Sequence, residues 1–133
     1  MNPNYSLVAR RAGHICEYCR APEAVFNLPF EVEHIVPLSR GGQADENNLA
    51  LSCRSCNLYK SDAVSAFDET TETTIRFFNP RTDNWAEHFV LDKETGEIKG
   101  ITAIAKATIP RLRINSNAQL TARVQWLKLG FFE

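Results

Sequence analysis

The sequence predicts an α+β fold: a small core held together by zinc, followed by a β-hairpin and helices. Two Cys-x-x-Cys pairs, Cys16 with Cys19 and Cys53 with Cys56, indicate one four-thiolate zinc site. Short runs of alternating apolar residues predict strands, and stretches with helical apolar spacing predict helices. The apolar fraction of 44% is ordinary for a globular domain. The cysteine-rich first half has few large aliphatic residues, so we expect it to need its metal to fold.

No apolar run reaches the roughly 18 residues of a membrane span, and the first residues lack the basic-then-apolar pattern of a signal peptide. We therefore expect a reducing, cytoplasmic setting, in which paired cysteines are metal ligands rather than disulfides. A redox pair is the alternative. It would require a thioredoxin-like strand and helix around one pair, and it would leave the other pair unexplained.

The formal net charge is −1, so the whole chain does not attract nucleic acid strongly. The charge is unevenly distributed, however: residues 1–60 are neutral, residues 61–97 carry a net −6 and residues 98–133 a net +5. A basic tail behind an acidic middle is compatible with a surface that binds a phosphate backbone. Solvated helix faces are the plainer explanation of the same pattern.

In the first half, a helix is expected over residues 7–12, capped by Ser6, and strands over 32–36 and 49–53 with an exposed loop at 39–47 between them. A helix should begin near Ser55, because Lys60 and three apolar residues as far as position 67 share one helical face. The polar residues 70–74 then mark the end of the core. We therefore divide the chain into a zinc-stapled core, 1–74, and a basic C-terminal extension, 75–133, packed on it.

In the extension, residues 75–78 fit a strand, and residues 89–91 and 98–101 fit a hairpin with Gly96 in its turn. Thr108 is a candidate N-cap for a short helix. Ser116 is a candidate N-cap for a longer helix that ends before Gly130. Its apolar stripe would be formed by Leu120, Val124 and Leu127.

Between and after the cysteine pairs run Glu33-His34-Ile35-Val36-Pro37-Leu38, Gly41-Gly42, Glu46-Asn47-Asn48-Leu49 and Cys53-Arg54-Ser55-Cys56-Asn57-Leu58-Tyr59-Lys60. In this order and with these gaps, the segment 14–60 resembles the HNH endonuclease family in its zinc-ribbon form. The resemblance implies a ββα-metal (His-Me finger) core: two short antiparallel strands, a loop between them, and a helix that closes over the strands.

The resemblance also implies a role for each matched residue. Glu33 and Asn57 would bind a catalytic divalent cation, His34 would be the general base, and Asn48 would brace the loop through hydrogen bonds to the backbone. Glu33 stands where His or Asp is commoner, and Asn57 where His is equally familiar. Both residues offer oxygen ligands, which favour Mg²⁺ or Mn²⁺ over zinc at this position.

Two geometric expectations accompany these roles. Neighbouring side chains of an extended strand point to opposite faces, so Glu33 and His34 can share a cleft only if a twist or bulge brings them together. His34 should also be held in orientation, with one ring nitrogen donating a hydrogen bond to a backbone carbonyl of the loop.

Basic residues near the motif and in the tail are candidates for contacts to phosphate. They are Arg40, Arg54, Lys60, Lys106, Arg111, Arg113, Arg123 and Lys128. Arg54 and Lys60 fit ordinary surface charge and stem packing equally well. Trp85 and Trp126 are expected in the core rather than as base-stacking platforms.

The expected function is metal-dependent hydrolysis of DNA phosphodiester bonds, leaving 5′-phosphate and 3′-hydroxyl ends as the family resemblance implies. DNA would be bound mainly through its backbone, since no base-reading helix is evident. The alternatives are a non-catalytic zinc-ribbon module that binds nucleic acid, and an HNH nuclease acting on RNA or branched DNA. A protein-interaction module would leave Glu33 and His34 without a purpose. The oligomeric state stays open.

Overall fold

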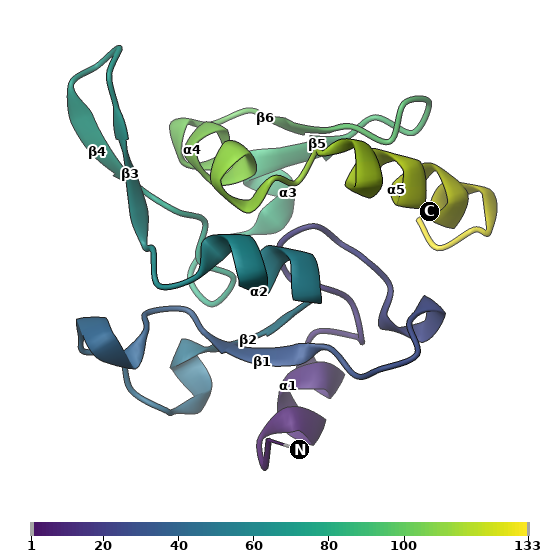
Figure 1. Ribbon diagram of the computed structural model, residues 1–133, viewed down its shortest axis with the longest axis horizontal. Helices are drawn as coiled ribbons and strands as arrows, with labels where there is room; N and C mark the ends of the chain where they lie inside the picture. The colour runs from purple at the N-terminus through teal and green to yellow at the C-terminus, as the bar shows by residue number, and fades with distance from the viewer. Residues whose placement is uncertain (1, 133) are drawn as a thin grey trace.

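The computed structural model describes residues 2–132. Its first half has three layers (Figure 1): helix α1 (Tyr5–Arg11) lies on one face of a two-stranded sheet, and helix α2 (Arg54–Lys60) lies on the other. The sheet pairs β1 (Glu31–His34) with β2 (Leu49–Ser52). The expected order of two strands and a helix is thus present, with helix α2 directly after β2.

The strands β1 and β2 are antiparallel with an uninterrupted register, from Glu31 opposite Ser52 to His34 opposite Leu49. Of the twist or bulge expected at Glu33 and His34, the bulge is therefore excluded. The loop between the strands contains two short 3-10 helices, η2 (Leu38–Arg40) and η3 (Glu46–Asn48). A third, η1 (Glu23–Val25), precedes β1.

The helix expected to run as far as residue 67 is wrong beyond Lys60. Helix α2 ends there because Ser61 adopts a positive φ of 53°, which breaks the helical path. The chain then forms a hairpin of β3 (Ser65–Asp68) and β4 (Thr73–Arg76). Because β4 spans residue 74, the predicted division between 74 and 75 falls inside this hairpin, which projects from the body (Figure 1).

The second hairpin is confirmed. After the short helix α3 (Trp85–His88), β5 (Phe89–Leu91) pairs with β6 (Ile98–Gly100). Gly96 lies in the turn with φ +79°, a conformation that favours glycine.

The two last helices differ in how well the sequence predicted them. Helix α4 (Ala103–Leu112) is capped by Thr102, not by Thr108. Thr108 is buried inside the helix, where its hydroxyl accepts a hydrogen bond from the Phe78 amide at 2.9 Å. Helix α5 (Asn117–Lys128) begins at the predicted cap, Ser116.

The buried face of α5 is not the predicted apolar stripe. Its buried residues are Gln119, Arg123 and Trp126, whereas Leu120, Val124 and Leu127 are only partly buried. Arg123 can occupy a fully buried position because it donates hydrogen bonds to the carbonyls of Gly96 and Ile114.

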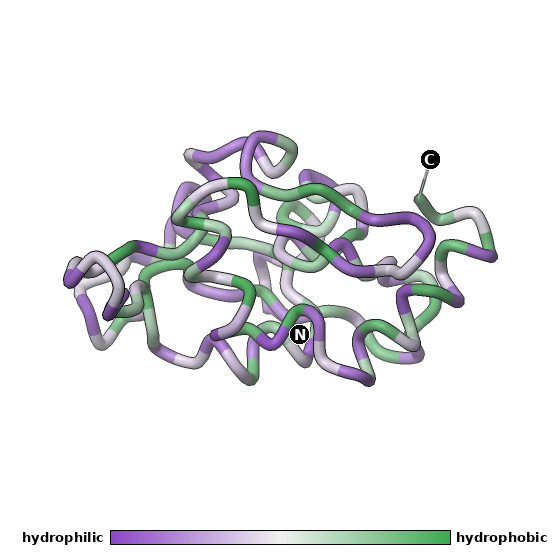
Figure 2. Tube along the Cα trace, turned by 90° about the horizontal axis from the view of Figure 1, so that it is seen from above, coloured by the Kyte–Doolittle hydropathy of each residue, from purple (hydrophilic) through white to green (hydrophobic). Residues whose placement is uncertain are grey.

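One core joins the two halves, because buried residues from α1, the sheet and the cysteine loops form one cluster with residues of β5, β6, α4 and α5. Helix α4 contacts α2, both strands of the first hairpin, and β6. Coloured by hydropathy, the chain alternates short apolar and polar stretches (Figure 2). Within residues 2–132, no helix has the length and apolar character needed to cross a membrane.

Candidate functional site

The four cysteines converge on one point. Their sulfur atoms lie within 4.8 Å of one another, all four side chains are buried, and the sulfurs of Cys19 and Cys53 are 3.6 Å apart. A zinc ion with bonds of about 2.3 Å to four sulfurs needs sulfur separations of about 3.8 Å. The cluster therefore has the dimensions and ligand chemistry of a tetrahedral zinc site.

Local backbone structure places these sulfurs. Cys53 is the N-cap of α2, and its sulfur accepts a hydrogen bond from the Cys56 amide in the first helical turn. The first pair lies in a tight loop in which the Cys16 amide donates to Ala21 and its carbonyl accepts from Arg20. The surrounding sulfurs, Cys16 first, hold the pKa of the Cys19 thiol well below its usual range. The same contacts between sulfurs raise the pKa of the Cys53 and Cys56 thiols, so without metal the negative charge of the cluster is favoured on Cys19.

The two residues between Cys16 and Cys19 fasten this loop to the sheet. Glu17 exchanges backbone and side-chain hydrogen bonds with Leu51 of β2, and its carboxylate also forms an ion pair with Arg81. Tyr18 is fully buried, and its hydroxyl donates to Glu33 at 2.7 Å. The loop from Cys16 to Cys19, called the zinc loop below, therefore makes direct contact with a predicted catalytic residue.

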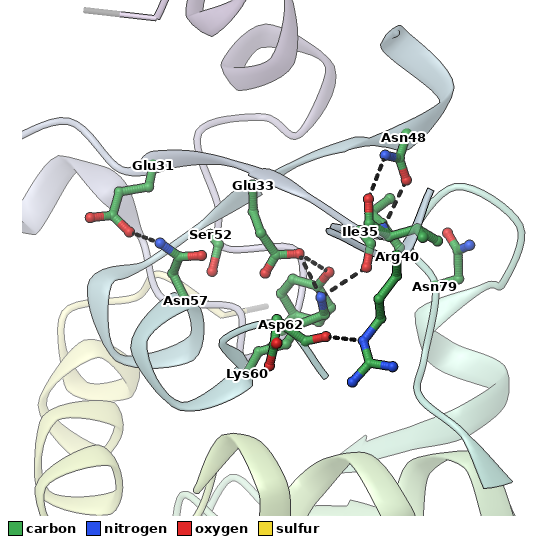
Figure 3. Close-up of polar contacts among 12 residues, drawn as sticks. Glu31, Glu33, Ile35, Arg40, Asn48, Ser52, Asn57, Lys60, Asp62 and Asn79 are labelled. Atoms are coloured by element: carbon green, nitrogen blue, oxygen red, sulfur yellow. Dashed lines mark hydrogen bonds and ion pairs between the residues drawn. The ribbon is translucent and has the colours of Figure 1, made fainter. Parts of the chain in front are cut away.

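Glu33 is buried, and its side chain points toward Lys60 (Figure 3). Its Oε1 atom accepts the hydrogen bond of Tyr18 and lies 3.4 Å from the Lys60 ammonium, which also donates to the Ile35 carbonyl at 2.9 Å. Its Oε2 atom is buried and has no hydrogen-bond partner among the described residues. Burial raises the pKa of Glu33 to about 7, and the attraction of Lys60 opposes this shift without cancelling it.

Asn57 projects from α2 toward the same face of β1. Its amide nitrogen donates to the Glu31 carboxylate, which also accepts from Arg54 at 3.0 Å, and its amide oxygen is on the side of Glu33 (Figure 3). Sequence reasoning missed Glu31 as a member of this site. The signal was available, since Glu31 and Glu33 are two positions apart on a strand and so share a face.

His34 is the last residue of β1. In a strand of regular register it lies on the face opposite Glu33. Its Nε2 atom is buried and lacks a hydrogen-bond partner within residues 2–132, so the predicted bond to a loop carbonyl is absent at this nitrogen. Asn57 and Glu33 thus face the same side of β1, with Ser52 between them (Figure 3), and His34 lies at the end of the same strand, on its other side.

Asn48 makes the backbone contacts expected of a residue that braces the loop. Its oxygen accepts from the Val36 amide at 2.8 Å, and its nitrogen donates to the carbonyls of Val36 and Gln43. Gly42 permits this closure, because a Cβ atom there would lie 1.7 Å from the Val36 carbonyl oxygen. The loop between the strands is therefore fixed at the point where His34 ends β1.

The predicted phosphate-binding residues fall into two groups. Lys60 and Arg123 are buried, with 1% and 0% exposed area, and both are occupied by internal hydrogen bonds. They therefore cannot contact DNA in this structure, which corrects the prediction for these two residues. The other six side chains are exposed: Arg40, Arg54, Lys106, Arg111, Arg113 and Lys128.

Several of these exposed residues already have partners. Arg40 donates to the Asp62 carbonyl, and Arg111 donates to the carbonyls of Tyr59 and Lys60 at the end of α2. Arg113 stacks over the Tyr59 ring, 4.3 Å from its centroid. These contacts gather Arg40, Arg111 and Arg113 around the end of α2.

Both tryptophans pack internally, as expected. Trp85 stacks on Phe89 and donates its indole N–H to the Tyr18 carbonyl at 2.9 Å. Trp126 is 7% exposed and contacts Phe26. Neither ring is free to stack on a nucleic-acid base.

The sulfur cluster, the two strands and α2 lie within one continuous segment of the chain. Residues 16–63 match the family model of the HNH endonucleases. The HNH segment, about a third of the chain, contains both cysteine pairs, the two strands, Asn48 and Asn57. A search of curated proteins and a search of solved structures each gave no significant match.

The predicted resemblance is thereby confirmed, and it implies a nuclease-type function and a nucleic-acid substrate. A small mixed domain with short antiparallel sheets and a four-cysteine cluster is consistent with an HNH segment.

Proposed function

We propose that the protein is a metal-dependent endonuclease that hydrolyses phosphodiester bonds of DNA. The observation that carries this proposal is the buried Oε2 atom of Glu33, which has no hydrogen-bond partner among the described residues. Glu33 belongs to the segment that matches the HNH family model, and this oxygen lies on the side of Asn57 (Figure 3). A buried carboxylate oxygen without a donor is costly unless a ligand satisfies it. A cation is the ligand that this donor set suits best.

The donor set is a carboxylate oxygen of Glu33 and the amide oxygen of Asn57, both hard ligands. They fit Mg²⁺ or Mn²⁺, which retain several positions for water and phosphate oxygens when few protein ligands are present. A cation bound there would offset negative charge on a phosphate and on the leaving oxygen. The four cysteines would hold a structural zinc ion and take no part in the chemistry.

His34 is the proposed general base. A neutral imidazole can take a proton from water near neutral pH, and Nε2 of His34 has no competing hydrogen bond among the described residues. Since His34 and Glu33 lie on opposite faces of β1, a phosphate would have to meet them at the end of the strand. The loop braced by Asn48 begins there.

The DNA backbone would be contacted by exposed basic residues at the end of α2 and on the C-terminal helices. Arg40, Arg111 and Arg113 surround the end of α2, and Lys106 lies on the same helix as Arg111. Contacts of this kind give affinity that depends on salt and little sequence preference.

One observation favours a second candidate, a non-catalytic nucleic-acid-binding module. The Lys60 ammonium lies 3.4 Å from Glu33, so this carboxylate already has a positive partner. Together with the position of His34 on the other face, this arrangement would suit an HNH segment that retains its zinc and has lost cleavage. RNA and branched DNA remain alternative substrates for an active form.

Cleavage assays separate these functions. Zinc-loaded protein is incubated with supercoiled plasmid, branched DNA and short RNAs, with Mg²⁺, with Mn²⁺, or with a chelator too weak to remove the zinc. We expect nicked or linear plasmid only when Mg²⁺ or Mn²⁺ is present. Binding of DNA without cleavage under every condition would instead identify the non-catalytic module.

A further inference from the structure

Tyr18, which lies inside the zinc loop, is not assigned a role by the family match or by the proposed chemistry. We propose that Tyr18 is a positioning residue. Its hydroxyl holds Glu33 so that only one carboxylate oxygen, Oε2, is available to a cation. This inference rests on the proposed function, because it concerns the cation held by Glu33 and Asn57.

Tyr18 is fixed at both ends. Its side chain is fully buried between Cys16 and Cys19, and its ring meets Phe78 edge to face at 6.4 Å. Its carbonyl accepts from the Trp85 indole at 2.9 Å, while its hydroxyl donates to Glu33 at 2.7 Å. A side chain restrained in this way holds its hydroxyl in one place.

The two oxygens of Glu33 are consequently unequal. Oε1 accepts a hydrogen bond from the Tyr18 hydroxyl and forms an ion pair with the Lys60 ammonium. Oε2 accepts no hydrogen bond from the described residues. A carboxylate without such donors can rotate, or can bind a cation through both oxygens. With Oε1 occupied, Glu33 would bind through Oε2 alone, the geometry that small, octahedral Mg²⁺ and Mn²⁺ accept readily.

This contact also links the two metal sites. Cys16 and Cys19, on either side of Tyr18, would be zinc ligands in the four-cysteine cluster. A zinc ion that fixes these cysteines would thereby fix Tyr18, and through it the carboxylate of Glu33. Outer partners of ligand residues commonly change metal affinity by about 10- to 100-fold when they are removed.

The test is Mn²⁺ affinity, measured by electron paramagnetic resonance on zinc-loaded protein without DNA. Tyr18→Phe removes only the hydroxyl. Tyr5→Phe is the matched control, since the Tyr5 hydroxyl donates to a different carboxylate, Glu23, also at 2.7 Å. We expect Tyr18→Phe to weaken Mn²⁺ binding about tenfold or more, with zinc content and melting temperature close to those of the control. Tyr5→Phe should bind Mn²⁺ like the unmodified protein.

Two results would overturn the proposed role of Tyr18 and leave the proposed function standing. Mn²⁺ affinity of Tyr18→Phe within twofold of the unmodified protein would show that the hydroxyl does not position Glu33. Loss of zinc from this variant would assign the hydroxyl to the stability of the zinc loop. If the unmodified protein itself binds no Mn²⁺ and cleaves no nucleic acid, the proposed function fails, and the inference fails with it.

Discussion

The side-chain amide of Asn48 closes the loop between β1 and β2 on the backbone of Val36. It accepts from the Val36 amide at 2.8 Å and donates to the Val36 carbonyl at 2.9 Å, and it makes a third bond to Gln43. Val36 follows His34 by two residues, so this contact fixes the backbone where β1 ends. Asn48 thereby holds the backbone next to His34, the proposed base.

Replacing Asn48 with alanine should therefore loosen this loop. Loss of three hydrogen bonds, which leaves part-buried backbone groups without partners, should lower the free energy of unfolding by about 1–3 kcal/mol. Urea unfolding measures the change, with zinc content as a check. Asn47→Ala is the control, because Asn47 is exposed. Equal stability of the two variants would remove Asn48 as the brace.

If the four-cysteine cluster holds a structural zinc ion, any cysteine replacement should have a strong effect. In Cys16→Ser, the weaker hydroxyl ligand leaves three thiolates for the metal, so the protein should lose zinc and melt at a lower temperature or aggregate. Metal analysis and thermal unfolding measure both effects. A variant that keeps its stability with no metal bound would contradict a structural zinc site.

The ion pair of Asp83 and Arg76 predicts a pH dependence of stability. Arg76 donates to both oxygens of Asp83, at 2.7 and 2.9 Å, and this hydrogen bonding holds the pKa of the Asp83 carboxyl below its usual range. A carboxyl with a lowered folded-state pKa stabilises the fold above its unfolded-state pKa, near 3.9, and this stabilisation is lost as the pH falls through the folded-state value.

Asp83→Asn isolates this effect. Urea midpoints of the variant and the unmodified protein should differ most above about pH 5 and converge as the pH falls below about 4. A difference that stays constant from pH 6 to about pH 3 would show that the charge of Asp83 contributes nothing to stability.

Arg123 provides a separate test of the buried face of α5. It is fully buried and donates to the Gly96 and Ile114 carbonyls, both at 2.8 Å. Arg123→Met should cost about 2 kcal/mol or more in unfolding free energy, because two buried carbonyls lose their donor. Lys128→Met, an exposed position on the same helix, should cost little. A larger loss of unfolding free energy in Lys128→Met than in Arg123→Met would contradict the buried position of Arg123.

The parts of the fold that local rules control were predictable. Paired cysteines at fixed spacing predicted the four-cysteine cluster, and the alternation around Val32 and Leu51 predicted the two strands. The cap at Ser116 and the glycine turn at Gly96 are likewise properties of a few neighbouring residues. Each of these features could be read without knowledge of tertiary contacts.

The parts that depend on tertiary contacts were not predictable. Thr108 has the residue type of a helix cap, yet it lies inside α4 because its hydroxyl bonds the distant Phe78 amide. Lys60 and Arg123 have the residue type of surface cations, yet both are buried where carbonyls from other segments accept their hydrogens. The residues next to them in the sequence do not indicate these distant partners.

The most direct test of the central claim is plasmid cleavage by His34→Ala, compared with unmodified protein in Mg²⁺ and in Mn²⁺. His88→Ala is the matched control, because that ring bonds Thr102 outside the HNH segment. We expect His34→Ala to lose cleavage while its zinc content equals that of the unmodified protein, and His88→Ala to retain cleavage. Unchanged cleavage by zinc-loaded His34→Ala would contradict the account.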